Sequence, residues 1–545
     1  MNIAAIATAP GTGGIAVIRL SGPNAFTITD KIFRARNRNK TASTAEAYTM
    51  LFGYIVNEES RDAACCVLTS EASQNSQLST LNSQLVDEVV VAIFRAPHSF
   101  TGENTVEISC HGSTYIQQEI LRLLIKAGAR MAGPGEFTQR AFLNGRLDLS
   151  QAEAVADLIN AQSAAAHTIA LNQMRGNFSS KLEELRRQLL HFVSLLELEL
   201  DFGDHDDLEF ADRTELNAVA EAIHSQLLRL QQTFSQGNAI KNGIPVAIVG
   251  ETNAGKSTLL NLLVGDNRAI VSDIHGTTRD VIEDTVNING LTFRFIDTAG
   301  IRQTSDIIEN MGIERTYEMI ERAQIILWVV DSTNVTEHIE WLAERIMRRT
   351  EGKRLIILLN KVDRLNDEEL ITLREWFEPY KTTVNRQQST DNSQSPNEAN
   401  SNSSPVLGEV PKAEGLTSVD CRQNLNPNGD CRPLTVDCRQ NTILEISAKQ
   451  SINTEQLTRL LYESAQMPDL SSGDIIISNL RHYEALTHAL ESIDRVIEGL
   501  QMNIPADFVA QDIREALFHL AEITGGEITT DEVLGNIFAH FCIGK

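Results

Sequence analysis

Short apolar runs alternate with helical patterns in the middle of the chain. The runs are rich in β-branched residues and span positions 246–249, 293–296, 325–330 and 355–359. Strands that alternate with helices are typical of a parallel sheet covered by helices. We therefore predict an α/β domain over about residues 241–466.

Helical periodicity is found on both sides of this block. From position 150 to about 200 turn residues nearly vanish, and apolar residues recur at steps of three and four: Leu182, Leu185, Leu189, Phe192 and Leu196. A similar spacing follows the block at Leu486, Leu490, Ile493, Ile497 and Leu500. The first pattern predicts one long helix with a packing seam. Together the two predict a helical domain, residues 146–240 and 467–545, interrupted by the α/β domain.

Residues 1–145 mix alternating apolar runs, such as 14–20, with glycine and proline punctuation at 9–14, which predicts an α+β domain. Two polar stretches interrupt these patterns. The first, 70–84, predicts a solvated loop. The second, 385–441, is rich in Asn, Ser, Gln and Pro and repeats the unit Val-Asp-Cys-Arg-Gln-Asn, so we expect a disordered surface insertion. The predicted fold class is thus multidomain, α/β and α.

Composition narrows the class of partner. Of 545 residues, 47 are Lys or Arg and 73 are Asp or Glu, a net charge of −26 that opposes nonspecific binding to a polyanion. An RNA partner would therefore need a local basic patch or a basic partner protein, although acidity could equally serve only solubility. Seven unevenly spread cysteines, no signal peptide and no apolar run near eighteen residues predict a cytoplasmic protein without a membrane span.

The sequence Gly-Glu-Thr-Asn-Ala-Gly-Lys-Ser at 250–257 fits a phosphate-binding loop between a strand and a helix. Backbone N–H groups of such a loop surround a phosphate, while Lys256 adds a charge and Ser257 a magnesium ligand. The nucleotide-binding residues predicted here are Asn253, Ala254, Gly255, Lys256, Ser257 and Thr258.

Four further elements follow in order and indicate GTP. Thr278 offers a hydroxyl for magnesium, Asp297 follows a strand as a carboxylate behind the metal, and Asp363 can accept both N–H groups of the guanine edge. Ser447, Ala448 and Lys449 would close the base pocket. The full set of predicted GTP contacts adds Ser272, Asp273, Ile274, His275, Gly276, Thr277, Thr298, Ala299, Gly300, Asn360 and Lys361.

The water-activating group is less obvious. Ile301 stands where Ras-type GTPases have a glutamine, and an apolar side chain cannot orient water. The acidic segment 306–309 is the nearest supplier. On the residues alone, Glu309 could equally be a surface residue at the start of a helix.

Over nearly its full length, apart from the two polar stretches, the chain resembles the MnmE (TrmE) family of tRNA-modification GTPases. The segments that carry the resemblance are 6–22, 99–104, 110–112, 134–149 and the terminal Phe-Cys-Ile-Gly-Lys at 541–545. The resemblance implies an N-terminal domain similar to folate-dependent one-carbon enzymes, which dimerises and binds a 5-formyl- or methylenetetrahydrofolate. Arg19, Glu107, Arg146 and Lys545 would line that site; Arg146 replaces a lysine of the family pattern.

The resemblance also implies that potassium replaces an arginine finger. Its ligands would be Asn253, Ser272, Ile274 and Thr277, with Ser272 in place of the expected threonine. Magnesium would be held by Ser257 and Thr278, and Glu309 would be the catalytic, water-activating residue. In the family the protein acts as a homodimer in a heterotetramer with MnmG, an FAD protein, and the pair modifies carbon 5 of the tRNA wobble uridine by aminomethyl or carboxymethylaminomethyl addition.

Three other functions remain open on sequence: a regulatory GTPase of ribosome assembly or translation, a folate-dependent aminomethyltransferase with a passenger GTPase, and a scaffold for MnmG. Cys542 has two interpretations as well. It is either a nucleophile toward a uracil carbon or a packing cysteine near the chain end.

Overall fold

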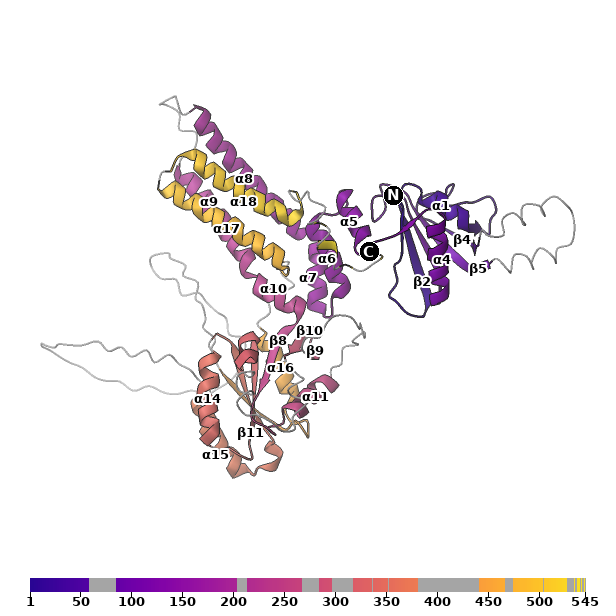
Figure 1. Ribbon diagram of the computed structural model, residues 1–545. Coiled ribbons are helices and arrows are strands. Elements are labelled where there is room, and N and C mark those ends of the chain that lie inside the picture. The colour runs from indigo at the N-terminus through magenta and orange to yellow at the C-terminus, as the bar shows by residue number, and fades with distance from the viewer. Residues whose placement is uncertain are drawn as a thin grey trace, which may run out of the picture.

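The computed structural model describes residues 1–57, 85–202, 213–266, 284–296, 317–335, 337–350, 352–380, 441–465, 474–502 and 504–526, with 534, 537–539, 541 and 544. They form a sheet domain at the N-terminus, a helical bundle and a second sheet domain (Figure 1). The predicted fold class is therefore confirmed. The loop predicted at 70–84 and, apart from its last residue, the insertion predicted at 385–441 lie outside the described residues. No helix in the described ranges is long and apolar enough to cross a membrane.

The N-terminal domain is a sheet with order β3-β4-β5-β6-β2-β1-β7, antiparallel except for the pair β1 and β7. Its strands are β1 Ile3–Ile6, β2 Gly13–Ser21, β3 Phe33–Ala35, β4 Thr49–Val56, β5 Leu85–Phe94, β6 Thr105–Gly112 and β7 Arg130–Met131. Helices α1 (Ala25–Ile32) and α4 (Thr114–Lys126) share one buried core with alternate residues of the strands, such as Ile108 and Cys110 of β6. The opposite face of the sheet carries Glu107 and Arg19, which are paired in register.

The helical bundle is assembled from both ends of the chain. The first part holds α6 (Leu149–Asn160), α7 (Ala164–Met174), α8 (Asn177–Phe202), α9 (Arg213–Gln232) and α10 (Phe234–Asn242). The second part holds α17 (Leu480–Gln501) and α18 (Ala506–Thr524). One apolar cluster contains Leu185 and Leu189 of α8 together with Leu486 and Ile493 of α17. The prediction of one helical domain interrupted by an insertion is therefore confirmed.

The prediction of one continuous helix from 150 to about 200 is wrong, because this stretch contains three helices. Ser163 begins α7 as its N-cap by accepting a hydrogen bond from the backbone N–H of Ala166. Gly176, with φ of 86°, separates α7 from α8 in a conformation that side-chain-bearing residues rarely adopt. The predicted seam lies entirely within α8, where its five apolar residues are buried.

The second sheet has the order β13-β12-β11-β8-β10-β9 and is parallel except for the hairpin β9–β10. Its strands are β8 Ile244–Val249, β9 Asp284–Ile288, β10 Leu291–Phe295, β11 Ile325–Asp331, β12 Arg354–Asn360 and β13 Thr442–Ile446. Alternate residues face opposite sides, so Val246 packs with α11 (Lys256–Asp266) and α16 (Thr454–Ser464), and Ala247 with α14 (Glu337–Arg349) and α15 (Asp367–Phe377). All four predicted strands are confirmed.

Two chain segments connect the helical bundle with this sheet domain, and they lie against each other. The outgoing segment is α10, and the returning segment is 474–479. The backbone N–H of Ile477 donates to the hydroxyl of Thr233 at 3.0 Å. A Cβ on Gly237 of α10 would lie 2.1 Å from the carbonyl oxygen of Ile477. We call this pair of segments the neck.

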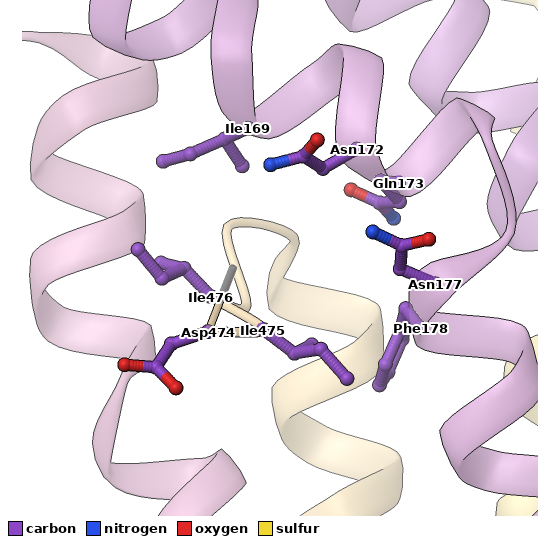
Figure 2. Close-up of a pocket in the computed structure, with 8 residues that line it drawn as sticks. All are labelled: Ile169, Asn172, Gln173, Asn177, Phe178, Asp474, Ile475 and Ile476. Atoms are coloured by element: carbon purple, nitrogen blue, oxygen red, sulfur yellow. The ribbon is translucent and has the colours of Figure 1, made fainter. Parts of the chain in front are cut away.

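A small hollow lies beside the neck, between α7, the start of α8 and the returning segment (Figure 2). It measures about 400 Å³, part of which is open to solvent. Amides from Asn172, Gln173 and Asn177 line it together with the apolar side chains of Ile169 and Ile475. A narrow hollow with several amide groups suits ordered water that bridges the helices.

Because the neck leaves no space at Gly237, we expect Gly237→Ala to destabilise the protein by about 2 kcal/mol, the cost typical of overpacking. Differential scanning calorimetry would measure this as a lowered transition temperature. Gly265→Ala is the matched control, since Gly265 is also helical and its added Cβ meets nothing within 4 Å. Equal transition temperatures for the two variants would contradict the tight packing of the neck.

A buried polar network joins α6 to α17 and α18. Arg481 donates to both oxygens of Glu153, at 2.9 and 3.0 Å, and to the carbonyl oxygens of Glu522 and Ile523 at the end of α18. His482 is fully buried with Nε2 2.7 Å from Glu153, and burial lowers its pKa. The neutral ring therefore donates from Nε2 to Glu153. Burial alone would raise the pKa of Glu153, but His482 and Arg481 lower it to about 2.

Candidate nucleotide-binding site

The phosphate-binding loop predicted at 250–257 lies between the end of β8 and the start of α11. Two of its glycines are sterically required. A Cβ on Gly250 (φ 146°) would lie 2.1 Å from the carbonyl oxygen of Val329, and one on Gly255 (φ 102°) 2.2 Å from Nδ2 of Asn360. The loop is thereby held against β11 and β12, with the N-terminus of α11 directed toward any phosphate in the loop.

Asn360, the last residue of β12, ties three loops together. Its Nδ2 donates to the carbonyl oxygen of Ala254 at 2.7 Å, and its Oδ1 accepts the backbone N–H of Ala448 at 3.0 Å. The side chain is buried, so these bonds are shielded from water. The predicted phosphate loop and the predicted base loops are therefore braced by one amide.

A hollow of about 1090 Å³, part of which is open to solvent, lies between these loops. Its volume is sufficient for a nucleotide. The residues that line it are Asn253, Gly255, Lys256, Ser257, Thr258, Asn360, Lys361, Asp363, Arg364, Ser447, Ala448 and Lys449. All but Arg364 were predicted from sequence motifs, and no motif marks Arg364.

Lys256 is the cation at the phosphate end. Its ammonium donates to the carbonyl oxygens of Gly250 at 2.8 Å and Glu251 at 2.6 Å. Burial lowers the pKa of Lys256. A phosphate beside this buried ammonium would favour its charged form, so the geometry and the charge both suit a polyphosphate.

The base end of the hollow is built on Lys361, Asp363 and Ser447. Lys361 has a left-handed backbone with φ of 69°, and its ammonium lies 2.5 Å from Oδ2 of Asp331. Asp363 accepts one long hydrogen bond at 3.4 Å from the amide of Gln450. Ser447 is buried, and its hydroxyl accepts the backbone N–H of Gln450. The Asp363 carboxylate thus has acceptor capacity left for a donor pair on a ligand.

Several predicted residues lie outside the described part of the chain: 272–278, 297–300 and Glu309. The hairpin β9–β10 lies between residues 272–278 and 297–300 in the sequence and belongs to the described part of the chain. It contacts the helical bundle through the backbone N–H of Ala165, which donates to the carbonyl oxygen of Gly290 at 3.2 Å.

A second group of predicted residues lies on the N-terminal sheet. Arg19 donates from Nε to Glu107 at 2.9 Å, and its NH1 reaches the carbonyl oxygen of Gly544 at 3.4 Å. The guanidinium also lies 5.5 Å from the ring centre of Phe100, a residue that no motif singled out as a ligand. Arg146 is exposed. Its Cγ lies 3.3 Å from the position that a Cβ on Gly102 would occupy, two residues along the chain from Phe100. Lys545 and Cys542 lie outside the described residues.

A parallel sheet with a glycine-rich phosphate loop and a guanine-type base pocket defines a GTPase of the P-loop class. Comparison with known proteins narrows this class. The family model described as the MnmE helical domain matches residues 149–542, and the model of the GTP-binding protein TrmE N-terminus matches residues 2–146. The chain belongs to the MnmE family of tRNA modification GTPases.

Individual relatives agree over the whole length. The chain is 51% identical to the tRNA modification GTPase MnmE of Parabacteroides distasonis, with all of both chains covered. It is 49% identical to that of Bacteroides fragilis and 43% identical to that of Flavobacterium johnsoniae, in each case over all of this chain and 99% of the relative.

Proposed function

We propose that this tRNA modification GTPase is stimulated by potassium and acts with an FAD-dependent MnmG partner at carbon 5 of the wobble uridine. A tetrahydrofolate derivative would supply the carbon added as an aminomethyl or carboxymethylaminomethyl group. The observation that carries the GTPase part is the convergence of Lys256, Asn360, Asp363 and Ser447 on one hollow of about 1090 Å³. This arrangement favours GTP turnover over the scaffold alternative, which needs no formed nucleotide pocket.

The cation assignments rest on the resemblance to the MnmE family, and the position of Asn253 supports them. Among the described residues, no group of three His, Cys, Asp or Glu side chains could hold a metal ion. We assign magnesium to the hydroxyls of Ser257 and Thr278 and to nucleotide oxygens. Asn253 is exposed at the rim of the hollow with φ of 66°, which suits a potassium ligand shared with Ser272, Ile274 and Thr277. Potassium there would offset the charge that spreads over the transferring phosphoryl group.

The folate assignment rests on the donor chemistry of the N-terminal sheet. A folate presents an amine-bearing pterin edge and an anionic glutamate tail. Glu107 offers a carboxylate for the first, with Arg19 held beside it at 2.9 Å, while the exposed Arg146 offers a guanidinium group for the second. The ring of Phe100 beside Arg19 adds an apolar surface. The carbonyl contact of Gly544 brings the terminal segment to this site, which supports a contribution from Lys545.

The open face of the N-terminal sheet supports a homodimer. Its exposed apolar side chains are Ile15, Met50, Phe52 and Val90. Exposed apolar side chains gathered on one face of a sheet mark an interaction surface, and a second copy of the chain would cover them. Cytoplasmic tRNA would then be recruited mainly by the MnmG partner of the heterotetramer, because the net charge of −26 repels nucleic acid.

The domain boundaries complete the proposal. We assign residues 1–145 to the folate-binding domain, 146–240 and 467–545 to the helical domain, and 241–466 to the G domain. The Cys-Ile-Gly-Lys motif ends the helical domain, and Cys542 is kept as a candidate thiol whose alternative is packing.

GTP turnover by the purified full-length protein tests the proposal. We expect kcat to be on the order of tenfold higher in potassium chloride than in sodium chloride, since the ion replaces a charged catalytic side chain. Glu309→Ala should lower kcat in potassium by a factor of roughly 10² to 10⁴, the usual contribution of a general base, and leave the Kd for GTP nearly unchanged.

The exposed residue Glu318 provides a matched control, and Glu318→Ala should hydrolyse GTP at the wild-type rate. Equal turnover in the two salts would overturn the potassium assignment. Wild-type turnover of Glu309→Ala would overturn the catalytic assignment. If Glu309→Ala still supports full tRNA modification by the complex, hydrolysis is dispensable and the scaffold alternative is correct.

A further inference from the structure

A carboxylate outside every nucleotide motif stands next to the base pocket. Asp331 is the last residue of β11, directly beside Asn360 in the register of β11 and β12. Its side chain is only 15% exposed and does not line the hollow. It accepts hydrogen bonds from Nζ of Lys361 at 2.5 Å, the hydroxyl of Thr333 at 2.7 Å and the backbone N–H of Thr333 at 3.1 Å. The carboxylate is thus fixed on one side by a turn and on the other by a lysine of the pocket.

The ion pair with Lys361 links Asp331 to the nucleotide-binding hollow. It lines the hollow between Asn360 and Asp363, and its left-handed backbone at φ of 69° sets the direction in which its side chain leaves β12. A free lysine side chain has four rotatable bonds, and ordering it on binding costs affinity. An ion pair that already holds the ammonium removes that cost before a nucleotide arrives.

The simplest alternative is that Asp331 only stabilises the turn after β11. That role accounts for the two bonds from Thr333, but it does not require the lysine. Burial alone would raise the pKa of Asp331, whereas the contacts with Lys361 and Thr333 lower it, so the group is ionised near neutral pH. An ionised carboxylate beside a pocket lysine is an electrostatic restraint as well as a turn residue.

We propose that Asp331 is a positioning residue for the guanine nucleotide, acting through Lys361. With the ammonium held by Asp331, the alkyl stem of Lys361 lies along the base end of the hollow and packs against the bound base. Asp331 itself does not touch the nucleotide. Its effect therefore depends entirely on the presence of Lys361.

A double-mutant cycle tests this dependence in the full-length protein. We expect Asp331→Asn to raise the Kd for GDP and GTP about tenfold, mainly through faster dissociation, because a held side chain resists release of the base. The kcat at saturating GTP should change less than about twofold, since the phosphate end is untouched. In a Lys361→Met background the same substitution should change the dissociation rate of a fluorescent GDP analogue by less than about twofold.

Two further variants keep the test decisive. Thr333→Val preserves the charge of Asp331 but removes one bond that orients it, and should speed GDP dissociation about threefold even if Asp331→Asn does not fold. Glu445→Gln is the matched control, because it breaks an exposed ion pair with Arg374 in the same domain and should leave dissociation unchanged. Unchanged or tighter binding by Asp331→Asn, an equal effect with and without Lys361, or wild-type dissociation by Thr333→Val would each overturn the proposal.

Discussion

Asp363→Asn is expected to lower the affinity for GTP by roughly a hundredfold or more. The carboxylate can accept two N–H groups from guanine, whereas a carboxamide presents an N–H donor to one of them. The charged hydrogen bonds are worth about 1.5–3 kcal/mol each, and the opposed donors add to the loss. Isothermal titration with GTP and with XTP would measure the change.

The same substitution should improve binding of XTP, because xanthine carries a carbonyl oxygen where guanine carries its amine. The improvement separates a change of recognition from a loss of folding. Arg364→Gln is a useful comparison, since Arg364 lines the hollow without belonging to a base motif. Wild-type affinity of Asp363→Asn for GTP would show that the base does not bind at this end of the hollow.

Glu153→Ala is expected to lower the free energy of unfolding of the helical domain by about 3–5 kcal/mol. The reason is that the partly buried Arg481 and the fully buried His482 lose the carboxylate that both of them contact. Urea denaturation followed by circular dichroism would measure the loss. Glu197→Ala is the control, because it breaks an exposed ion pair with Arg514 between α8 and α18 and should cost less than about 1 kcal/mol.

This network also predicts acid sensitivity. The pKa of Glu153 is about 2 in the folded chain and 4.5 ordinarily. Between these values the unfolded carboxylate takes up a proton that the folded one does not. Unfolding is therefore favoured as pH falls from about 5 toward 2. Glu153→Gln should flatten this part of the stability profile, and an unchanged profile would contradict the assigned ionisation.

His482 also makes the protein less stable as pH falls, but in a higher pH range than Glu153. Its pKa is lowered by burial, so only the unfolded ring gains a proton as pH falls through its ordinary value near 6.5. Stability therefore declines in this window as well, and it declines toward acid rather than toward alkali.

The elements that could be predicted from sequence are those whose apolar pattern directly reflects burial, on one face or on both. The runs in β8, β10, β11 and β12 are apolar because both faces of that sheet are covered. The apolar residues of α8 recur at helical spacing because one face of that helix is buried in the bundle. Strands β9 and β13 were not predicted, because sequences such as Asp-Thr-Val-Asn-Ile at 284–288 mix polar and apolar residues at the edges of the sheet.

The candidate site divides in a similar way. Motif residues such as Lys256 and Asp363 could be placed from local spacing, because phosphate and guanine chemistry fixes which residue types are needed. Asp331, which holds Lys361, carries no such local pattern. It lies 30 positions from Lys361 in the sequence, so only the tertiary fold brings the two side chains together.

Because the chain is made from its N-terminus, the neck affects the order in which the two halves of the helical bundle assemble. Helices α8 and α9 bury their apolar residues against α17 and α18, which begin about 250 residues after α9 ends. At roughly 5–20 residues per second, the ribosome needs about 12–50 s to produce this interval. The nucleotide-binding domain thus has time to fold first, and its closely spaced ends then hold the two halves of the bundle together as the last helices emerge.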